Sequence, residues 1–255
     1  MKLTKQELAD RLRLEAYPRS AGYDPEWVIE NMMGPNVLWL AESLCQQLTL
    51  QPNMRVLDMG CGKAISSIFL AKEFGVQVWA NDLWISASDN WSRITAAGLA
   101  DRVFPIQAEA HALPYAEGFF DALVSFDAYQ YFGTDNLYLG YYAKFVKPGG
   151  QIGIVVPGVQ REFEAAPPDH LAGYWDWEFW SFHSPEWWRR HWDRTRKVDV
   201  TQADSVPDGW RQWRLWAQVC GEAGYPAHTD ELEMLEADAG RNMGFTRVVA
   251  QRRLE

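Results

Sequence analysis

Short apolar runs alternate with amphipathic stretches between residues 55 and 156. The apolar runs are RVLDM (55–59), VQVWAN (76–81), RVFPIQ (102–107), FDALVSF (120–126) and QIGIVV (151–156). Strands of a parallel sheet are covered by helices on both faces, so they appear as nearly continuous apolar runs. The pattern therefore predicts an α/β fold in which five parallel strands alternate with helices. The turn KPGG, at 147–150, is expected to end the helix before the fifth strand and to start that strand.

The pattern differs on either side of this region. Two helical segments are expected first, at 4–15 and at 25–48, the second broken at Gly34–Pro35 because proline cannot continue a helix. Later elements are expected at 184–195, where Ser184 caps a helix that opens with Pro185, at 197–203 (strand), 209–220 (helix), from Thr229 (acidic helix) and at 244–251 (strand). We expect a seven-stranded, mostly parallel sheet with an antiparallel last strand. The predicted domains are an N-terminal helical lid (1–50) and a main domain (51–255) with a Trp-rich insertion at about 157–220.

Composition narrows the possible partners. The 255-residue chain carries a formal net charge of -10, which repels phosphate backbones and anionic lipid heads. We therefore expect neither nucleic acid nor membrane as a partner. The three cysteines lack metal-type spacing, no signal-like segment is visible and no run of about 18 apolar residues occurs, so a cytoplasmic protein is expected. The oligomeric state is left open.

The motif VLDMGCGKA, at 56–64, is the sharpest chemical signal. A strand ends near Asp58, Gly60 and Gly62 follow two residues apart, and a helix opens directly. Glycine allows a ligand to approach the backbone where a β-carbon would clash. The same turn occurs in dinucleotide-binding proteins, and many such turns have only a structural role. The motif alone therefore indicates a nucleoside site without fixing the ligand.

Two acidic residues at later strand ends support a nucleoside site. Asp82 ends the second strand, where a carboxylate can accept hydrogen bonds from both ribose hydroxyls, and Leu83 is placed to pack on adenine. Glu109 follows the third strand, where it could accept the adenine amino group. Each has a plain alternative, Asp82 as a helix cap and Glu109 as a solvated carboxylate. Their joint position at three successive strand ends favours the binding role.

Five ordered motifs, VLDMGCGKA, VQVWANDL, AEAHALPY, FDALVSFDAYQYF and VKPGGQIGIV, resemble those of class I methyltransferases that use S-adenosylmethionine (SAM). The resemblance covers about residues 37–157 and is greatest to the small-molecule branch with ubiquinone-pathway, phosphobase and cyclopropane-synthase-like enzymes. It implies a Rossmann-like three-layer sandwich and SAM as methyl donor, with S-adenosylhomocysteine (SAH) as product. The implied donor-binding residues, to which we add Cys61, Leu83 and Ser125, are Asp58, Gly60, Gly62, Asp82, Glu109 and Ala110. One departure is Ala64, where a third glycine is common.

The loop after the fourth strand is the expected reacting face. Asp127 and Tyr131 are spaced i, i+4, so a helical turn would place them on one face. Phosphobase methyltransferases have Asp and His at these positions, so Tyr131 puts a histidine base in doubt. Asp127 could bind a cationic amine or accept a proton, or it could be a cap with the tyrosines as packing. In the lid, Tyr23 is expected to touch donor or acceptor, and Gly34 and Asn36 to approach the carboxylate of the donor.

No metal is expected. Methyl transfer from a sulfonium is an in-line displacement that needs positioning, proton removal and exclusion of water. The fifth strand ends VVPGVQ, without the carboxylate that metal-dependent relatives carry there. The five histidines, His111, His170, His183, His191 and His228, show no ligand-type spacing.

Nine of the 14 tryptophans fall between Trp175 and Trp216. Helical spacing favours packing for four of them, Trp188, Trp192, Trp213 and Trp216. Trp175, Trp177 and Trp180 could instead wall an acceptor pocket, either for a cation or for a flat apolar acceptor.

Four functions stay open at this point. We favour methylation of a small molecule. The alternatives are methylation of a protein or RNA, a SAM-binding protein without catalysis and a dinucleotide oxidoreductase. The oxidoreductase is disfavoured because the third glycine of its G-x-G-x-x-G fingerprint is absent.

Overall fold

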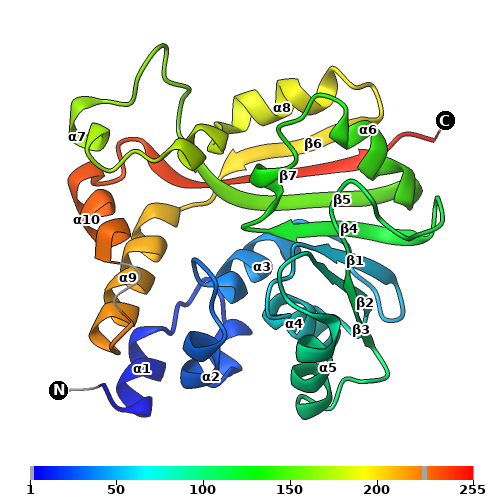
Figure 1. Cartoon of the computed structure of the whole chain (residues 1–255), viewed down its shortest axis with the longest axis horizontal. Coiled ribbons are helices and arrows are strands. Elements are labelled where there is room, and N and C mark those ends of the chain that lie inside the picture. The colour runs from blue at the N-terminus through cyan, green and yellow to red at the C-terminus, as the bar shows by residue number, and fades with distance from the viewer. Residues whose placement is uncertain (1–2, 226–228, 255) are drawn as a thin grey trace.

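The computed structural model describes residues 3–225 and 229–254 and contains one seven-stranded sheet. The strand order is β3-β2-β1-β4-β5-β7-β6, which runs from bottom to top in Figure 1. The strands are β1 (Arg55–Met59), β2 (Gln77–Asp82), β3 (Val103–Gln107), β4 (Phe120–Phe126), β5 (Val146–Val159), β6 (Val198–Ser205) and β7 (Met243–Arg252). Neighbours from β3 to β5 pair in parallel, and β7 pairs antiparallel with both β5 and β6. The predicted Rossmann-like sheet is confirmed.

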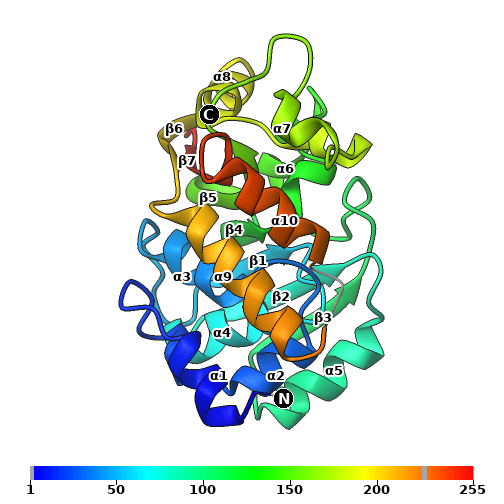
Figure 2. The ribbon, with the colours of Figure 1, turned by 90° about the vertical axis from the view of Figure 1, so that its left-hand side faces the viewer.

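Helices cover both faces of the sheet. They are α1 (Lys5–Arg11), α2 (Pro25–Glu30), α3 (Val37–Cys45), α4 (Ile65–Phe74), α5 (Ala87–Ala96), α6 (Tyr138–Tyr142), α7 (Asp169–Ala172), α8 (Pro185–Asp193), α9 (Gly209–Glu222) and α10 (Thr229–Asp238). Short 3-10 helices lie at η1 (Ser20–Gly22), η2 (Tyr129–Tyr131), η3 (Ala143–Phe145) and η4 (Trp177–Ser181). Figure 2 shows α9 and α10 packed side by side at one end of the sheet.

Strand side chains alternate between two buried clusters. In β1, Val56 joins the cluster beneath α3, α4 and α9, while Leu57 joins the cluster beneath α6 and α8. In β4, Val124 and Leu123 divide in the same way. This period of two is what a sheet covered on both faces requires.

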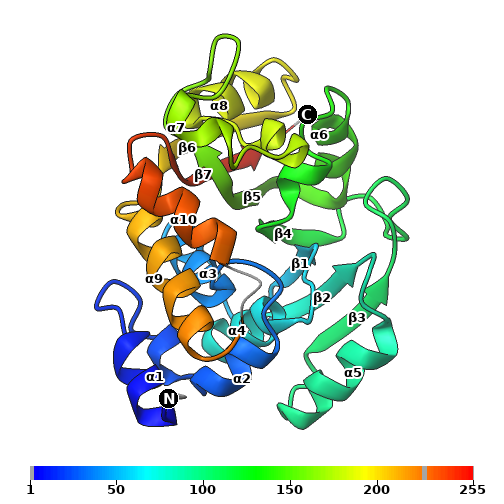
Figure 3. The same ribbon diagram turned by 60° about the vertical axis from the view of Figure 1, so that its left-hand side comes forward.

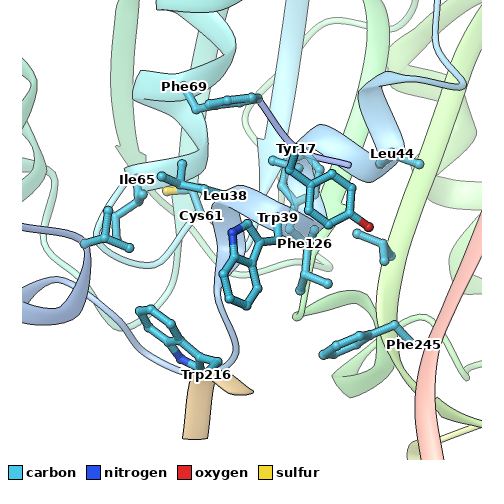
Figure 4. Close-up of a cluster of buried hydrophobic side chains, with 14 of the residues drawn as sticks. Tyr17, Leu38, Trp39, Leu44, Cys61, Ile65, Phe69, Phe126, Trp216 and Phe245 are labelled. Carbon is cyan, nitrogen blue, oxygen red and sulfur yellow. The ribbon is translucent and has the colours of Figure 1, made fainter. Parts of the chain in front are cut away.

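Helix α3 belongs to the core. All its residues from Leu38 to Cys45 are buried, and it packs on α4 and β5. Figure 4 shows Leu38, Trp39 and Leu44 of this helix close to side chains of α4 and α9. The last helix of the 1–50 segment is thus one layer of the sandwich, while α1 and α2 lie outside it near α9 (Figure 3). The division into domains at residue 50 stays a prediction.

The KPGG turn does not lie where the sequence suggests. Strand β5 begins at Val146, before the turn, and its pairing with β4 shifts from Phe120↔Val146 to Ala122↔Gln151. Residues 147–150 therefore form a bulge inside the strand, which Lys147 fixes by an ion pair with Asp121 of β4. The expectation that the turn starts the strand is wrong.

Candidate active site

A cavity of about 310 Å³ lies at the carboxyl ends of the central parallel strands. The loops after β1, β2, β3 and β4 all line it, together with the segment before α3. Ligands bind at this edge in open parallel sheets because several loops converge there. Of the expected site residues, nine line it: Gly60, Cys61, Gly62, Asp82, Leu83, Glu109, Ala110, Asp127 and Tyr131.

The loop after β1 has a backbone conformation and a close contact that require glycine. Gly60 and Gly62 both have positive φ, +74° and +54°. A β-carbon on Gly60 would come within 2.3 Å of the β-carbon of Ala128, in the loop after β4. Glycine is required at this position for both reasons. Cys61 is buried between them, and burial raises the pKa of its thiol, so it lines the cavity as a neutral group.

Ala64 occupies the position of the missing third glycine. Its φ is +61° and its ψ is 22°, a left-handed conformation at the N-cap of α4. Non-glycine residues pay roughly 1–2 kcal/mol in this region. The turn geometry is therefore retained despite the substitution, at the cost of backbone strain.

The carboxylate of Asp82 is occupied by backbone donors. Its Oδ2 accepts the Gly62 N–H at 2.7 Å, and its Oδ1 accepts the N–H groups of Trp84 and Ile85 at 2.8 and 2.9 Å. A carboxylate has about four acceptor positions. Asp82 thus fixes the glycine loop and keeps one position for a further hydroxyl.

Glu109 and Ala110 line the cavity after β3. Glu109 accepts the backbone N–H of His111 at 2.7 Å and contacts Nδ1 of that histidine at 2.8 Å. The hydrogen bond from His111 is the main reason why the pKa of Glu109 lies below its ordinary value. The glutamate is held as a carboxylate beside the cavity.

Asp127 lies where the loop leaves β4, with a left-handed φ of +54°. Its backbone N–H donates to the Val155 carbonyl at 2.9 Å, and its Oδ1 accepts from Gln130 Nε2 at 3.4 Å. Burial raises the pKa of this carboxyl to about 8, and the negative charge of Glu231 on α10 adds to the effect. An added β-carbon on Gly34 would lie 2.3 Å from Oδ2, so the carboxyl packs against the segment before α3.

Tyr131 lines the same cavity from η2. Burial and the charges of Asp127, Glu178 and Glu231 raise the pKa of the phenol to about 12. The loop is a 3-10 turn, with three residues per turn, which brings Gln130 rather than Tyr131 onto the Asp127 carboxyl. The sequence did not predict a role for Gln130, because α-helical spacing was expected after Asp127.

Three expected site residues do not line the cavity. Tyr23 points elsewhere: its hydroxyl donates to Glu73 at 3.1 Å and its ring packs on Phe69. Asp58 is fully buried and accepts the hydroxyls of Ser66 and Ser67, so it positions the start of α4. Burial is also the main reason why the pKa of Asp58 is raised to about 6.

Ser125 is the third of these residues. It is buried, and its hydroxyl donates to the Met59 carbonyl at 2.7 Å. In this geometry, Tyr23, Asp58 and Ser125 therefore do not contact a ligand in the cavity directly. Of the two further lid residues, Gly34 lines the cavity, whereas Asn36 caps α3.

Several cavity residues were not expected. Met33 lies over Gly62, and Trp84 follows Leu83 at the mouth with 71% of its surface exposed. The rings of Trp84 and Tyr131 lie 6.4 Å apart, so the loops after β2 and β4 meet above the end of β1. The sequence signal for this contact was a tryptophan placed two residues after Asp82, the predicted ribose carboxylate.

The tryptophans with helical spacing differ in their location from the others of the Trp-rich segment. Trp188, Trp192, Trp213 and Trp216 are buried, which confirms packing. Trp216 Nε1 donates to the Gly34 carbonyl at 2.9 Å and thereby ties α9 to the cavity wall. Trp175, Trp177 and Trp180 do not line the cavity.

Within residues 3–225 and 229–254, no three His, Cys, Asp or Glu side chains gather as metal ligands. His228 lies outside the described residues. In that same part of the chain, no helix has the length and apolar character to cross a membrane.

Residues 56–150 match the methyltransferase domain family. Among curated proteins, the chain is 28% identical over 120 residues to methyltransferase GfsG of Streptomyces halstedii, covering 45% of this chain and 42% of that protein. It is 32% identical over 106 residues to a demethylmenaquinone methyltransferase of Mycolicibacterium paratuberculosis, covering 41% and 42%. The chain thus spans less than half the length of these relatives.

Solved structures agree in fold. A geranyl diphosphate C-methyltransferase from Streptomyces coelicolor gives a TM-score of 0.65 at 16% identity, covering 83% of this chain and 78% of that one. A Haemonchus contortus phosphoethanolamine N-methyltransferase 2 gives 0.70 at 18% identity, covering 98% and 60%. At such identities the likeness concerns the fold alone. The family match and the curated relatives indicate a methyltransferase domain at residues 56–150, and the solved methyltransferase structures have the same fold as this chain.

Proposed function

We propose that the chain binds SAM across the ends of β1, β2 and β3 and methylates a small molecule held in front of the loop after β4. The observation that carries this proposal is the shared cavity: the glycine loop, Asp82, Glu109, Asp127 and Tyr131 all line it. The family match supports the donor.

An adenosyl donor fits the residues present. Gly60 and Gly62 expose backbone at the cavity wall, and no β-carbon blocks approach there. Asp82 keeps one acceptor position for a ribose hydroxyl, while Glu109 and Ala110 border the place expected for adenine. When bound, SAM supplies an electrophilic methyl group on a sulfonium.

The loop after β4 would act on the acceptor. Asp127 can hold or take a proton at Oδ2, because a carboxyl with a pKa near 8 exists in both forms close to neutral pH. Tyr131 keeps its phenol proton at that pH and can orient the acceptor by donating a hydrogen bond. The exposed rings of Trp84 and Tyr131 can exclude water from the mouth once an acceptor is bound.

The favoured acceptor class is a small molecule. The net charge of -10 opposes RNA, and the cavity is of small-molecule size. A metal-independent displacement and a cytoplasmic location remain predictions. Methylation of a macromolecule and SAM binding without turnover are the alternatives that the experiment must separate.

Two measurements test this function. Calorimetry with SAM and with SAH should show binding to the purified chain. Incubation with methyl-labelled SAM and a metabolite extract should place label in the small-molecule fraction. Label in polymer would favour a macromolecular acceptor, and donor binding without any transfer would favour a non-catalytic role. If neither SAM nor SAH binds, the proposal is wrong.

A further inference from the structure

The three carboxylates that line the cavity differ in how their charges are compensated. Asp82 accepts three backbone N–H groups, and Glu109 is paired with His111. The Asp127 carboxyl accepts a hydrogen bond from Gln130 Nε2 at 3.4 Å, which is long for such a bond. Asp127 therefore faces the cavity with far less compensation than the other two.

No basic side chain of the cavity wall compensates Asp127. Among the described residues of the lining, Lys63 is the one lysine or arginine, and its Nζ donates to the Glu30 carbonyl at 3.2 Å. The histidine of the lining, His111, is paired with Glu109. Placing a carboxylate in such a position costs free energy unless a cation or several donors accompany it.

Aromatic rings lie on the same side of the cavity. Tyr131 is 52% exposed and contacts the more exposed Trp84 from across the end of β1. Asp127, Glu178 and Glu231 all contribute to the raised pKa of the Tyr131 phenol, so acidic side chains lie around this ring. Glu231 is itself held by Trp213 Nε1, which donates to it at 3.0 Å. Aromatic faces together with carboxylates form the typical surroundings of a bound ammonium group.

Building on the proposed function, we propose that the acceptor is a cationic amine, whose ammonium group lies between the Asp127 carboxylate and the rings of Trp84 and Tyr131. A neutral apolar acceptor would use the rings but would offer the Asp127 carboxyl neither a charge nor a hydrogen-bond donor. If the methylated nitrogen carries a proton, this proton passes to Asp127. The freed lone pair then forms the N–C bond to the methyl group, and the S–C bonding pair stays on the donor sulfur.

A pair of probes of equal shape and different charge tests this inference. Choline and its neutral isostere 3,3-dimethylbutan-1-ol differ in a quaternary nitrogen against a quaternary carbon. Titration into the SAH-loaded protein by calorimetry should show choline binding at least about tenfold more tightly, a difference of about 1.4 kcal/mol. Asp127→Asn should remove most of this preference and leave the affinity for the isostere unchanged.

Two further variants provide controls. Glu117→Gln removes an equal charge from an exposed turn outside the cavity, and it should preserve the preference. Trp84→Phe should keep the preference for choline over the isostere. Trp84→Ala should weaken choline binding severalfold, because a ring face is lost. SAH affinity is measured for each variant to verify an intact donor end.

The outcomes separate the two proposals. Failure of the wild-type protein to bind SAM or SAH overturns the proposed function, and this inference with it. If SAH binds normally, three results overturn the cationic acceptor alone. These results are equal affinity for the two probes, tighter binding of the isostere, and no choline binding at millimolar concentration. Equal loss of both probes in Asp127→Asn also overturns it, since a structural role would have that effect.

Discussion

Asp82 ends β2 and Asp127 follows β4, the two strands that flank β1, yet the surroundings of the two carboxyl groups differ. Asp82 accepts three backbone N–H groups of the loops after β1 and β2 and keeps one acceptor position. Asp127 has a left-handed backbone and one long hydrogen bond from Gln130. A carboxylate held by several backbone N–H groups mainly stabilises the fold, whereas one with little compensation in a cavity is available to a charged ligand. The first marks the donor side and the second the acceptor side of the same cavity.

The largest effect is expected for Asp127→Asn on turnover. Loss of a proton acceptor or charge partner at the reacting centre typically reduces rates by about 10²–10⁴-fold. The measurement is kcat with the acceptor identified through labelled SAM, with Glu117→Gln as the charge-matched control. Tyr131→Phe should have a smaller effect, because it removes only one hydrogen bond. Full turnover in both variants would show that this loop is not the reacting face.

Asp82→Ala should mainly affect stability. Three N–H groups would lose a charged acceptor, so the free energy of unfolding should fall by about 3 kcal/mol. Asp82→Asn should lose less stability, because its amide oxygen can still accept the N–H groups of Trp84 and Ile85. Urea unfolding of both variants beside Asp127→Asn provides the test. The comparison between the two aspartates fails if Asp127→Asn is destabilised as much as Asp82→Ala.

The pH dependence of stability should report on the Asp127 carboxyl. The folded-state pKa of Asp127, about 8, lies above the usual value of about 4, so the folded protein retains a proton that the unfolded chain releases. Stability from this group is fully present below pH 4 and is lost as the pH rises towards 8, by at most about 1.4 kcal/mol per pH unit.

Urea unfolding between pH 5 and 8 should therefore show a flatter profile for Asp127→Asn than for the wild-type protein. Asp58 contributes a slope of the same sign up to about pH 6 and is present in both proteins. Parallel profiles would mean that the Asp127 carboxyl is not perturbed.

The smallest effect is expected at Ala64, on the donor side. Ala64→Gly relieves the left-handed conformation but loses a buried methyl group and gains unfolded-chain entropy, so the stability gain should stay below about 1 kcal/mol. Ala64→Val cannot adopt this conformation without strain and should destabilise the fold clearly. Thermal unfolding measures both, and a clear loss for Ala64→Gly would contradict the strain at this residue.

The sequence predicts the sheet well because its strands are nearly all apolar and its turns contain glycine. It also predicts which loops meet at the cavity, since the carboxyl ends of parallel strands share one edge. It fails where tertiary contacts decide: Tyr23 bonds Glu73, and Asp58 binds two serines of α4. The contacts of Trp84 and Gln130 could not be predicted, because they depend on loop conformation, which apolar periodicity does not encode.

The position of β7 has a consequence for how the protein is made. Residues 243–252 leave the ribosome after β5 and β6, yet they form an interior strand between these two strands. Until they emerge, β5 presents an unpaired edge and β6 has no partner in the sheet. Nascent chains of this fold should therefore rely on chaperones until β7 has emerged, since exposed edges of this kind invite aggregation.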